Sequence, residues 1–152
     1  VLGAGIYTGS LDLDINGLTL RGHTGNPTDV VIDGGGAATA VSVTEDSVAL
    51  KSLRVTNAVT GIDVAPMSSA QFFDADNLRV DGTTDGLKVF DSIGLMEVSI
   101  QNSTFSNNSG NGVNITNADG AAKRIFPFSS VSAALSCPST SSRSASNRWH
   151  SS

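Results

Sequence analysis

Four charged residues recur at a fixed interval and are the side chains best suited to chemistry. Arg54 and Arg79 lie 25 residues apart, and so do Asp63 and Lys88. Arginines on neighbouring repeats can bind the carboxylate of a uronate or a sulfate, because each guanidinium presents planar, bidentate donors. A solvated face on which nearby acids balance these cations explains the same residues without any ligand. We treat the four as candidates for contact with a ligand.

A repeated four-residue motif positions Asp63 and Lys88. The motif reads glycine, apolar, polar, apolar, and its copies are "AVSV" at 40–43 (with Ala for Gly), "GIDV" at 61–64, "GLKV" at 86–89 and "GVNI" at 112–115. Apolar residues at alternate positions predict a β-strand with one buried side. We expect the glycine to mark the corner where the chain enters this first sheet, and the apolar residues to fill the core. The outward third residues are then Ser42, Asp63, Lys88 and Asn114.

Further columns extend the repeat to units of about 21–26 residues. The corresponding positions are Val48, Phe73 and Val98; Leu50, Ala75 and Ile100; Ser52, Asn77 and Asn102; and Val55, Val80 and Phe105. Each unit has three short period-2 segments, which predicts one coil of a solenoid whose strands pair with their copies about 4.8 Å away. The predicted fold class is all-β: an incomplete right-handed parallel β-helix with three short strands per coil and an irregular Ser-rich C-terminal tail.

The N-terminal segments carry a family resemblance. "VLGAGIY", "LDLDI", "GLTLRG" and "VVIDGGG", followed by the "GIDV"-type copies, resemble the opening of right-handed parallel β-helix proteins of the pectate-lyase-like superfamily over about residues 1–118. The resemblance implies an extracellular or cell-surface protein, of which this chain holds the N-terminal coils. It also implies that Ser52, Asn77 and Asn102 form a ladder at a turn, with Asn102 pointing inward to hydrogen-bond the turn backbone.

The same resemblance implies a chemistry for the first sheet, whose outward face often forms the groove in polysaccharide-cleaving members. A lyase there needs carboxylates for Ca²⁺ and a base to remove the proton next to the sugar carboxylate. Asp63 and Lys88 come nearest to this set, although a cross-coil salt pair accounts for them equally well. The sequence lacks the Asn-Thr-Asp, Asp-Asp, His-Gly and Arg-Ile-Lys set of polygalacturonases and the Arg-x-Pro-x-x-Arg element of pectate lyases. We therefore assign no catalytic, cofactor-binding or metal-binding residue.

Turn carboxylates leave one cofactor question open. Asp81, Asp85 and Asp91 are expected in turns, where Asp commonly caps backbone groups. Two of them can still supply oxygens to a weak surface Ca²⁺. Apart from this Ca²⁺, no cofactor is expected.

The charge distribution divides the chain in two. All 14 acidic residues and five of the nine basic residues lie within 1–120, giving that part a net charge of −9, whereas residues 121–152 carry +4. An acidic body argues against nucleic acid as a partner. No apolar run is long enough for a membrane span, and the single Cys137 excludes an intrachain disulfide. We predict β-helix coils over 1–120 and a Ser-rich tail over 121–152, which is either disordered or an artefact of truncation.

Three classes of function fit these observations. The first is a non-catalytic scaffold, adhesin or carbohydrate-binding module, with polysaccharide as its partner and Arg54, Arg79, Asp63 and Lys88 as candidate contacts. The second is the N-terminal part of a polysaccharide lyase, epimerase or glycoside hydrolase. The third is a phage or fibre element that trimerises. The absence of a dense acid–base cluster favours the first. Open solenoid ends also predict self-association, because uncapped strand edges pair readily with another chain.

Overall fold

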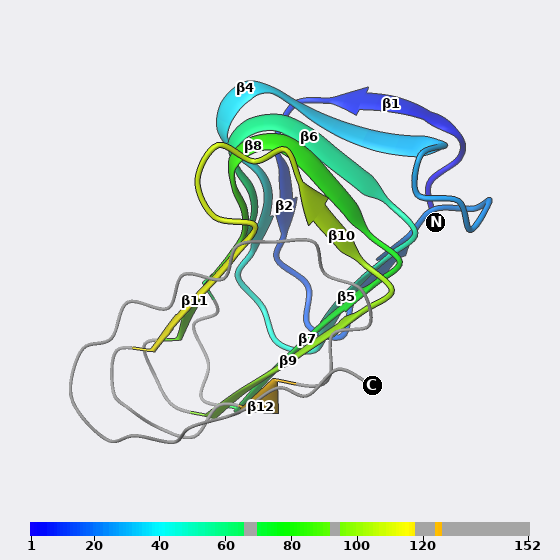
Figure 1. Ribbon diagram of the computed structural model, residues 1–152. Coiled ribbons are helices and arrows are strands. Elements are labelled where there is room, and N and C mark those ends of the chain that lie inside the picture. The colour runs from blue at the N-terminus through cyan, green and yellow to red at the C-terminus, as the bar shows by residue number, and fades with distance from the viewer. Residues whose placement is uncertain (66–69, 92–94, 118–123, 126–152) are drawn as a thin grey trace, which may run out of the picture.

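The computed structural model describes residues 1–65, 70–91, 95–117 and 124–125. This part of the chain is all-β, with parallel strands stacked as a β-solenoid of about four turns. The predicted fold class is confirmed: each strand lies beside the copy of itself from the next coil, as Figure 1 shows for β4, β6 and β8. The described residues contain no helix long and apolar enough to cross a membrane.

Two parallel sheets enclose the core. The 7-stranded sheet contains β1 (Gly5–Thr8), β2 (Leu11–Leu13), β4 (Val30–Val43), β6 (Arg54–Val64), β8 (Arg79–Asp91), β10 (Thr104–Ser106) and β11 (Val113–Asn117). The 5-stranded sheet contains β3 (Thr19–Arg21), β5 (Val48–Lys51), β7 (Ala70–Asp76), β9 (Leu95–Gln101) and β12 (Arg124–Ile125). β12 falls within the segment that we predicted to be a tail, and the rest of residues 121–152 lies outside the described residues.

The middle coils have a long bent strand where the sequence predicted two short ones. In β6 and β8 the bend is one residue with positive φ, Asn57 at 58° and Gly82 at 67°. Asn and Gly enter this left-handed conformation at low cost. Because the corner is so short, pairing resumes at once on its far side: Thr56 pairs with Asp81 before the bend, and Ala58 with Thr83 after it.

The bend divides the outer surface of the large sheet into two parts. We call the outward side of the strands before the bend the arginine face; it comprises β1, the first parts of β4, β6 and β8, and β10. We call the outward side after the bend the motif face; it comprises β2, the last parts of β4, β6 and β8, and β11. The two faces belong to the same coils but point in different directions (Figure 1).

The predicted registers and core are confirmed on both faces. On the motif face Ser42 pairs with Asp63, Asp63 with Lys88 and Lys88 with Asn114. The apolar neighbours of these four residues point inward. Those that are buried are Val41, Val43, Ile62, Val64, Leu87, Val89 and Val113, whereas Ile115 at the last coil is half-buried.

The motif glycines do not mark a corner, contrary to the prediction. Gly61 lies inside β6 and Gly86 inside β8, and neither has positive φ. A Cβ on Gly61 would lie 2.6 Å from the Gly86 carbonyl oxygen, and one on Gly86 would lie 2.5 Å from the Gly112 carbonyl oxygen. Glycine is needed here because the next coil's backbone passes too close for any side chain, not because the chain turns.

The expected Asn ladder is present in part, because Asn77 Nδ2 donates to Ser52 Oγ at 3.0 Å and to the Gly25 carbonyl oxygen at 2.7 Å, but the inward direction expected of Asn102 is wrong. Ser52, Asn77 and Asn102 are the corner residues, with φ of 54°, 54° and 50°, but Asn102 is exposed and its Nδ2 donates to Asp76 Oδ1 at 3.0 Å. The left-handed corner turns its own side chain away from the core and directs the following residue inward. Those following residues, all buried, are Leu53, Leu78 and Ser103.

Candidate functional site

The four candidate residues form two separate pairs on two faces. Arg54 and Arg79 pair in register at the start of β6 and β8, on the arginine face. Asp63 and Lys88 pair in register near the ends of the same strands, on the motif face. The bend at Asn57 and Gly82 separates the pairs. The expected columns are present, but the structure does not unite the four residues in one site.

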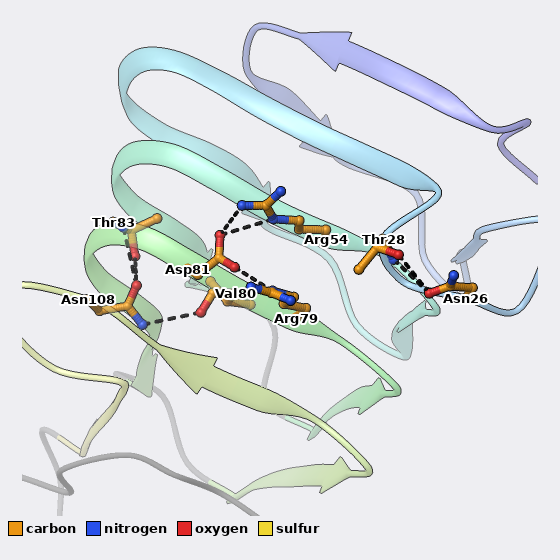
Figure 2. A network of polar contacts seen from close by, with 8 residues as sticks. All are labelled: Asn26, Thr28, Arg54, Arg79, Val80, Asp81, Thr83 and Asn108. Carbon is orange, nitrogen blue, oxygen red and sulfur yellow. Dashed lines mark hydrogen bonds and ion pairs between the residues drawn. The ribbon is translucent and has the colours of Figure 1, made fainter.

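Asp81 joins the two arginines. Its Oδ1 accepts hydrogen bonds from Arg54 Nε at 3.0 Å and from Arg54 Nη2 at 2.7 Å. Its Oδ2 accepts one from Arg79 Nε at 2.5 Å. Figure 2 shows the carboxylate between the two guanidinium groups. The side chain of Asp81 is only 5% exposed, whereas those of Arg54 and Arg79 are 34% and 43% exposed. The carboxylate therefore lies at the floor of the cluster, with the arginines toward solvent.

The electrostatics of this cluster favour a charged Asp81. Burial alone would raise the pKa of its carboxyl, but the hydrogen bonds and charges of Arg54 and Arg79 outweigh burial and lower the pKa below its usual value. Asp81 is thus an anion at neutral pH, and the arginines are always cations. The Arg54–Asp81–Arg79 cluster carries a net charge of +1.

This role of Asp81 differs from the prediction, which placed Asp81 in a turn as a capping residue. The signal was present in the period of the strand. Asp81 follows Arg79 by two residues, so both point to the same side of β8. It also pairs with Thr56, which lies two residues after Arg54. A carboxylate in that position has one arginine on its own strand and one on the neighbouring strand.

The pair on the motif face is much looser. Lys88 Nζ lies 3.9 Å from Asp63 Oδ2, and the side chains are 42% and 28% exposed. Asp63 Oδ1 and Asn114 Oδ1 are buried atoms without a hydrogen-bond partner among the described residues. Since Asp63 and Asn114 are the cross-strand neighbours of Lys88, the ladder presents polar atoms around one lysine without fixing them to each other.

The carboxylates considered for Ca²⁺ are engaged elsewhere or dispersed. Asp81 is held by the arginines, and Asp85 Oδ1 accepts hydrogen bonds from the backbone N–H and the Nδ2 of Asn111 at 3.0 and 3.1 Å. Asp91 is the last residue of β8. Within the described part of the chain, no group of three or more His, Cys, Asp or Glu residues is placed to hold a metal ion.

A second polar network secures the bend next to the arginine face. Asn108 Oδ1 accepts hydrogen bonds from Thr83 N at 3.2 Å and Thr83 Oγ1 at 2.8 Å, and Asn108 Nδ2 donates to Val80 O at 3.4 Å (Figure 2). Ser109 and Gly110 donate from their backbone to the carbonyls of Thr83 and Thr84 at 2.9 and 2.8 Å. These contacts tie the segment after β10 to β8 and explain the Asn-rich sequence there as structural.

Comparison with known proteins finds no matching family model, no matching curated protein and no matching solved structure. The parallel β-solenoid is therefore established by the structure alone.

Proposed function

We propose that the chain is a non-catalytic β-solenoid scaffold of the pectate-lyase-like type that contacts polysaccharide through its outer faces. The observation that supports this most is that each of the candidate charged residues has an ionic partner within the protein. Asp63 is paired with Lys88, and Arg54 and Arg79 share Asp81. A general acid or base must be free to exchange a proton with substrate, whereas a binding surface needs only groups at fixed spacing.

The motif face supplies such a surface. Its outward column runs Asp12, Ser42, Asp63, Lys88 and Asn114, one residue per coil. Neighbouring members are about 4.8 Å apart, so the column offers hydroxyl, carboxylate, ammonium and amide groups along a straight line. An extended polysaccharide lying on this line would receive a hydrogen bond from, or donate one to, every coil. The side chains of Lys88 and Asp63, which are 42% and 28% exposed, are accessible to sugar hydroxyls in this arrangement.

We place the protein outside the cell or at the cell surface, where polysaccharides are accessible. The support for this location is the resemblance of the N-terminal segments to extracellular β-helix proteins. The support for the scaffold class is the regular ladder itself. The test uses the full chain and combines a binding array of neutral and acidic polysaccharides with a depolymerisation screen on the same glycans, run with and without Ca²⁺.

The expected result is binding without product formation. Lys88→Ala and Asp63→Ala should weaken binding, and Lys51→Ala is the matched control, because Lys51 lies on the small sheet and pairs with Asp74 at 3.0 Å. Product that disappears in Lys88→Ala would replace the scaffold with an enzyme whose base is Lys88. Binding that all three variants weaken equally would remove the motif face from the proposal.

Self-association through the first coil is part of the same proposal. Large apolar side chains that are exposed gather there, with Ile6 70% exposed; the others are Val1, Tyr7 and Ile15. β1 and β3 are the last strands of their sheets at this end, and the outer edge of β3 is covered only where Leu2 N donates to Arg21 O at 2.8 Å, among the described residues. We expect light scattering at tens of micromolar to show species larger than the monomer, and Ile6→Lys to reduce them. A sharp monomer peak for the unmodified chain would contradict this.

A further inference from the structure

We infer that the Arg54–Asp81–Arg79 cluster is a binding site for one anionic group, the carboxylate or sulfate of an acidic polysaccharide, and that Asp81 holds the two guanidinium groups in position for it. The inference rests on the proposed contact with polysaccharide, but it concerns the arginine face rather than the motif face. It identifies the class of glycan as acidic.

The cluster retains hydrogen-bond donors after Asp81 is satisfied. A guanidinium has five N–H donors. Arg79 gives only its Nε–H to Asp81, so both of its Nη groups have no partner among the described residues. Arg54 gives its Nε–H and one Nη2 hydrogen, which leaves its Nη1 group. The inner edges of the guanidinium groups are used by the protein, and the outer groups remain for a ligand.

The position of these donors is fixed before any ligand arrives. Asp81 is almost fully buried and bonds to both arginines, so their side chains have already lost the rotamer freedom that an exposed arginine would lose on binding. Immobilising a long side chain on binding has an entropic cost that lowers affinity. An anion that meets the cluster therefore encounters donors already aligned.

The neighbouring residues on the arginine face are suited to an acidic sugar. Thr104 pairs with Arg79 on one side, and Val31 pairs with Arg54 on the other. Thr104 is exposed and brings a hydroxyl next to Arg79. The parallel column of Thr56, Asp81 and Ser106 adds two half-buried hydroxyl residues. One anionic group with sugar hydroxyls around it finds complementary partners across three coils.

Charge distinguishes this cluster from the other ion pairs in the described part of the chain. Lys51 has one acid partner, Asp74, and Lys88 has one, Asp63, so each pair is neutral. The arginine cluster has two cations for one buried carboxylate. Asp33 lies near enough for the charge of Arg54 to affect its pKa, but that effect is the smallest; the hydrogen bonds from Gly35 and Asn57 lower the pKa more. Asp33 Oδ1 accepts those two bonds at 2.9 and 2.7 Å and does not bond to the arginines.

The test is a calorimetric titration of the full chain at low salt with four probes. These are an oligogalacturonate for the carboxylate, a sulfated dextran for the sulfate, unmodified dextran as the neutral glycan, and inorganic sulfate. We expect an acidic glycan to bind more tightly than dextran, and the preferred acid to identify the source of the anionic group. Added salt should weaken this difference, because the guanidinium groups are partly exposed.

Three variants test the assignment to the arginines. Arg79→Ala should weaken binding of the acidic glycan about tenfold or more, since hydrogen bonds to charged groups are the strong ones. Arg79→Lys keeps the charge but loses the planar fork, so it should bind less tightly than the unmodified chain even where Arg79→Ala fails to fold. Lys51→Ala removes the same charge from another surface and should change binding less than twofold.

Each outcome bears on one of the two proposals. Equal losses in Arg79→Ala and Lys51→Ala, or an Arg79→Lys variant that binds like the unmodified chain, would overturn the site, because general positive charge would then suffice. Neutral dextran binding as tightly as the acidic glycans would also overturn the site but keep the carbohydrate function. Inorganic sulfate that binds through Arg79, with no polysaccharide bound at all, would keep the site and reject the carbohydrate function.

Discussion

The arginine face and the motif face bring charged residues together by the same rule and with different results. On both, cross-coil register places matching residues of β6 and β8 side by side. On the arginine face this gives hydrogen bonds of 2.5–3.0 Å around a buried carboxylate. On the motif face it gives a contact of 3.9 Å between two partly exposed side chains. Register decides which residues are neighbours, but burial and a third residue decide whether they interact strongly.

The third residue makes the difference because like charges stack on the arginine face. Arg54 beside Arg79 would repel if each stood alone, and Asp81 relieves this by bonding to both. On the motif face Asp63 beside Lys88 is already an attractive pair, so nothing requires a further partner. We therefore expect the arginine face to depend strongly on its acid and the motif face to depend mainly on the packing beneath it.

The largest expected effect is the loss of that acid. Asp81→Asn keeps the size of the side chain but leaves the two arginines without a carboxylate. Removing one partner of a buried pair typically costs about 3–5 kcal/mol, and because the arginines are a third or more exposed we expect about 2–3 kcal/mol of lost free energy of unfolding. Urea denaturation of the full chain measures this. The matched control is Asp63→Asn on the motif face, which should lower the free energy of unfolding by less than about 0.5 kcal/mol. Equal losses in the two variants would contradict the expectation that the arginine face depends more strongly on its carboxylate than the motif face does.

On the motif face, the free energy of unfolding should depend most on the close packing of the backbone beneath the outward side chains. Gly86→Ala places a methyl group 2.5 Å from the Gly112 carbonyl oxygen, and overpacking of this kind costs about 1–3 kcal/mol. We expect a loss of about 2 kcal/mol in the same denaturation experiment, larger than that of any charge substitution on this face. Gly3→Ala is the control, since the nearest atom to its added Cβ is Tyr7 Oη at 3.9 Å. A Gly86→Ala variant as stable as Gly3→Ala would show that the coils can separate locally.

Lowering the pH into the acidic range should remove the stability that Asp81 contributes on the arginine face. The pKa of Asp81 is lower in the folded chain than its ordinary value of 3.8, because the arginines outweigh the effect of burial. A carboxyl with a depressed folded pKa adds stability above its unfolded pKa, about 3.9, and that stability is lost as the pH falls through the folded pKa. The free energy of unfolding should therefore decline as the pH drops below about 4.

Denaturation curves between pH 6 and pH 3 check this, with Asp81→Asn as the comparison. The variant should have a shallower decline than the unmodified chain, although some decline remains because the pKa of Asp33 is also lowered, chiefly by the Gly35 backbone hydrogen bond. The protonated carboxyl still accepts hydrogen bonds, so the effect should be smaller than that of the Asp81→Asn substitution. Parallel declines in both chains would show that Asp81 does not contribute.

The sequence predicted the fold and the columns because both follow from alternation and spacing. Period-2 apolar positions and a constant interval are enough to place Arg54 beside Arg79 and Asp63 beside Lys88, and the structure has both registers. The assignment of Asp81 to a turn was wrong because alternation and spacing do not show where a strand ends. A one-residue bend at Gly82 lets β8 continue on both sides of the corner.

The direction of side chains at corners could not be predicted from the sequence, for a related reason. Asn102 and Gly86 were both interpreted from residue type: Asn as an inward hydrogen-bonding ladder and Gly as a turn. At Asn102 the positive φ turns the amide outward, and at Gly86 an ordinary strand residue lacks room for a Cβ. Both depend on the distance between neighbouring coils at one point of the cross-section, which a single sequence does not encode in any one residue.

The smallest expected effect concerns the direct coupling on each face, and it is the sharpest test of the contrast. A double-mutant cycle with Lys88→Met and Asp63→Asn should give a coupling energy below about 0.5 kcal/mol, as is usual for exposed pairs. The matching cycle with Arg79→Met and Asp81→Asn should exceed about 1 kcal/mol, because the carboxylate is buried and the hydrogen bond is short. Asp63 and Lys88 pair across β6 and β8, whereas Arg79 and Asp81 lie two residues apart on β8. Each cycle removes one cation and one anion, so differences in net charge cancel. A Lys88–Asp63 coupling as large as that of Arg79–Asp81 would mean that the motif face holds its ion pair firmly in solution, and its polar atoms would then be less free to bind a polysaccharide.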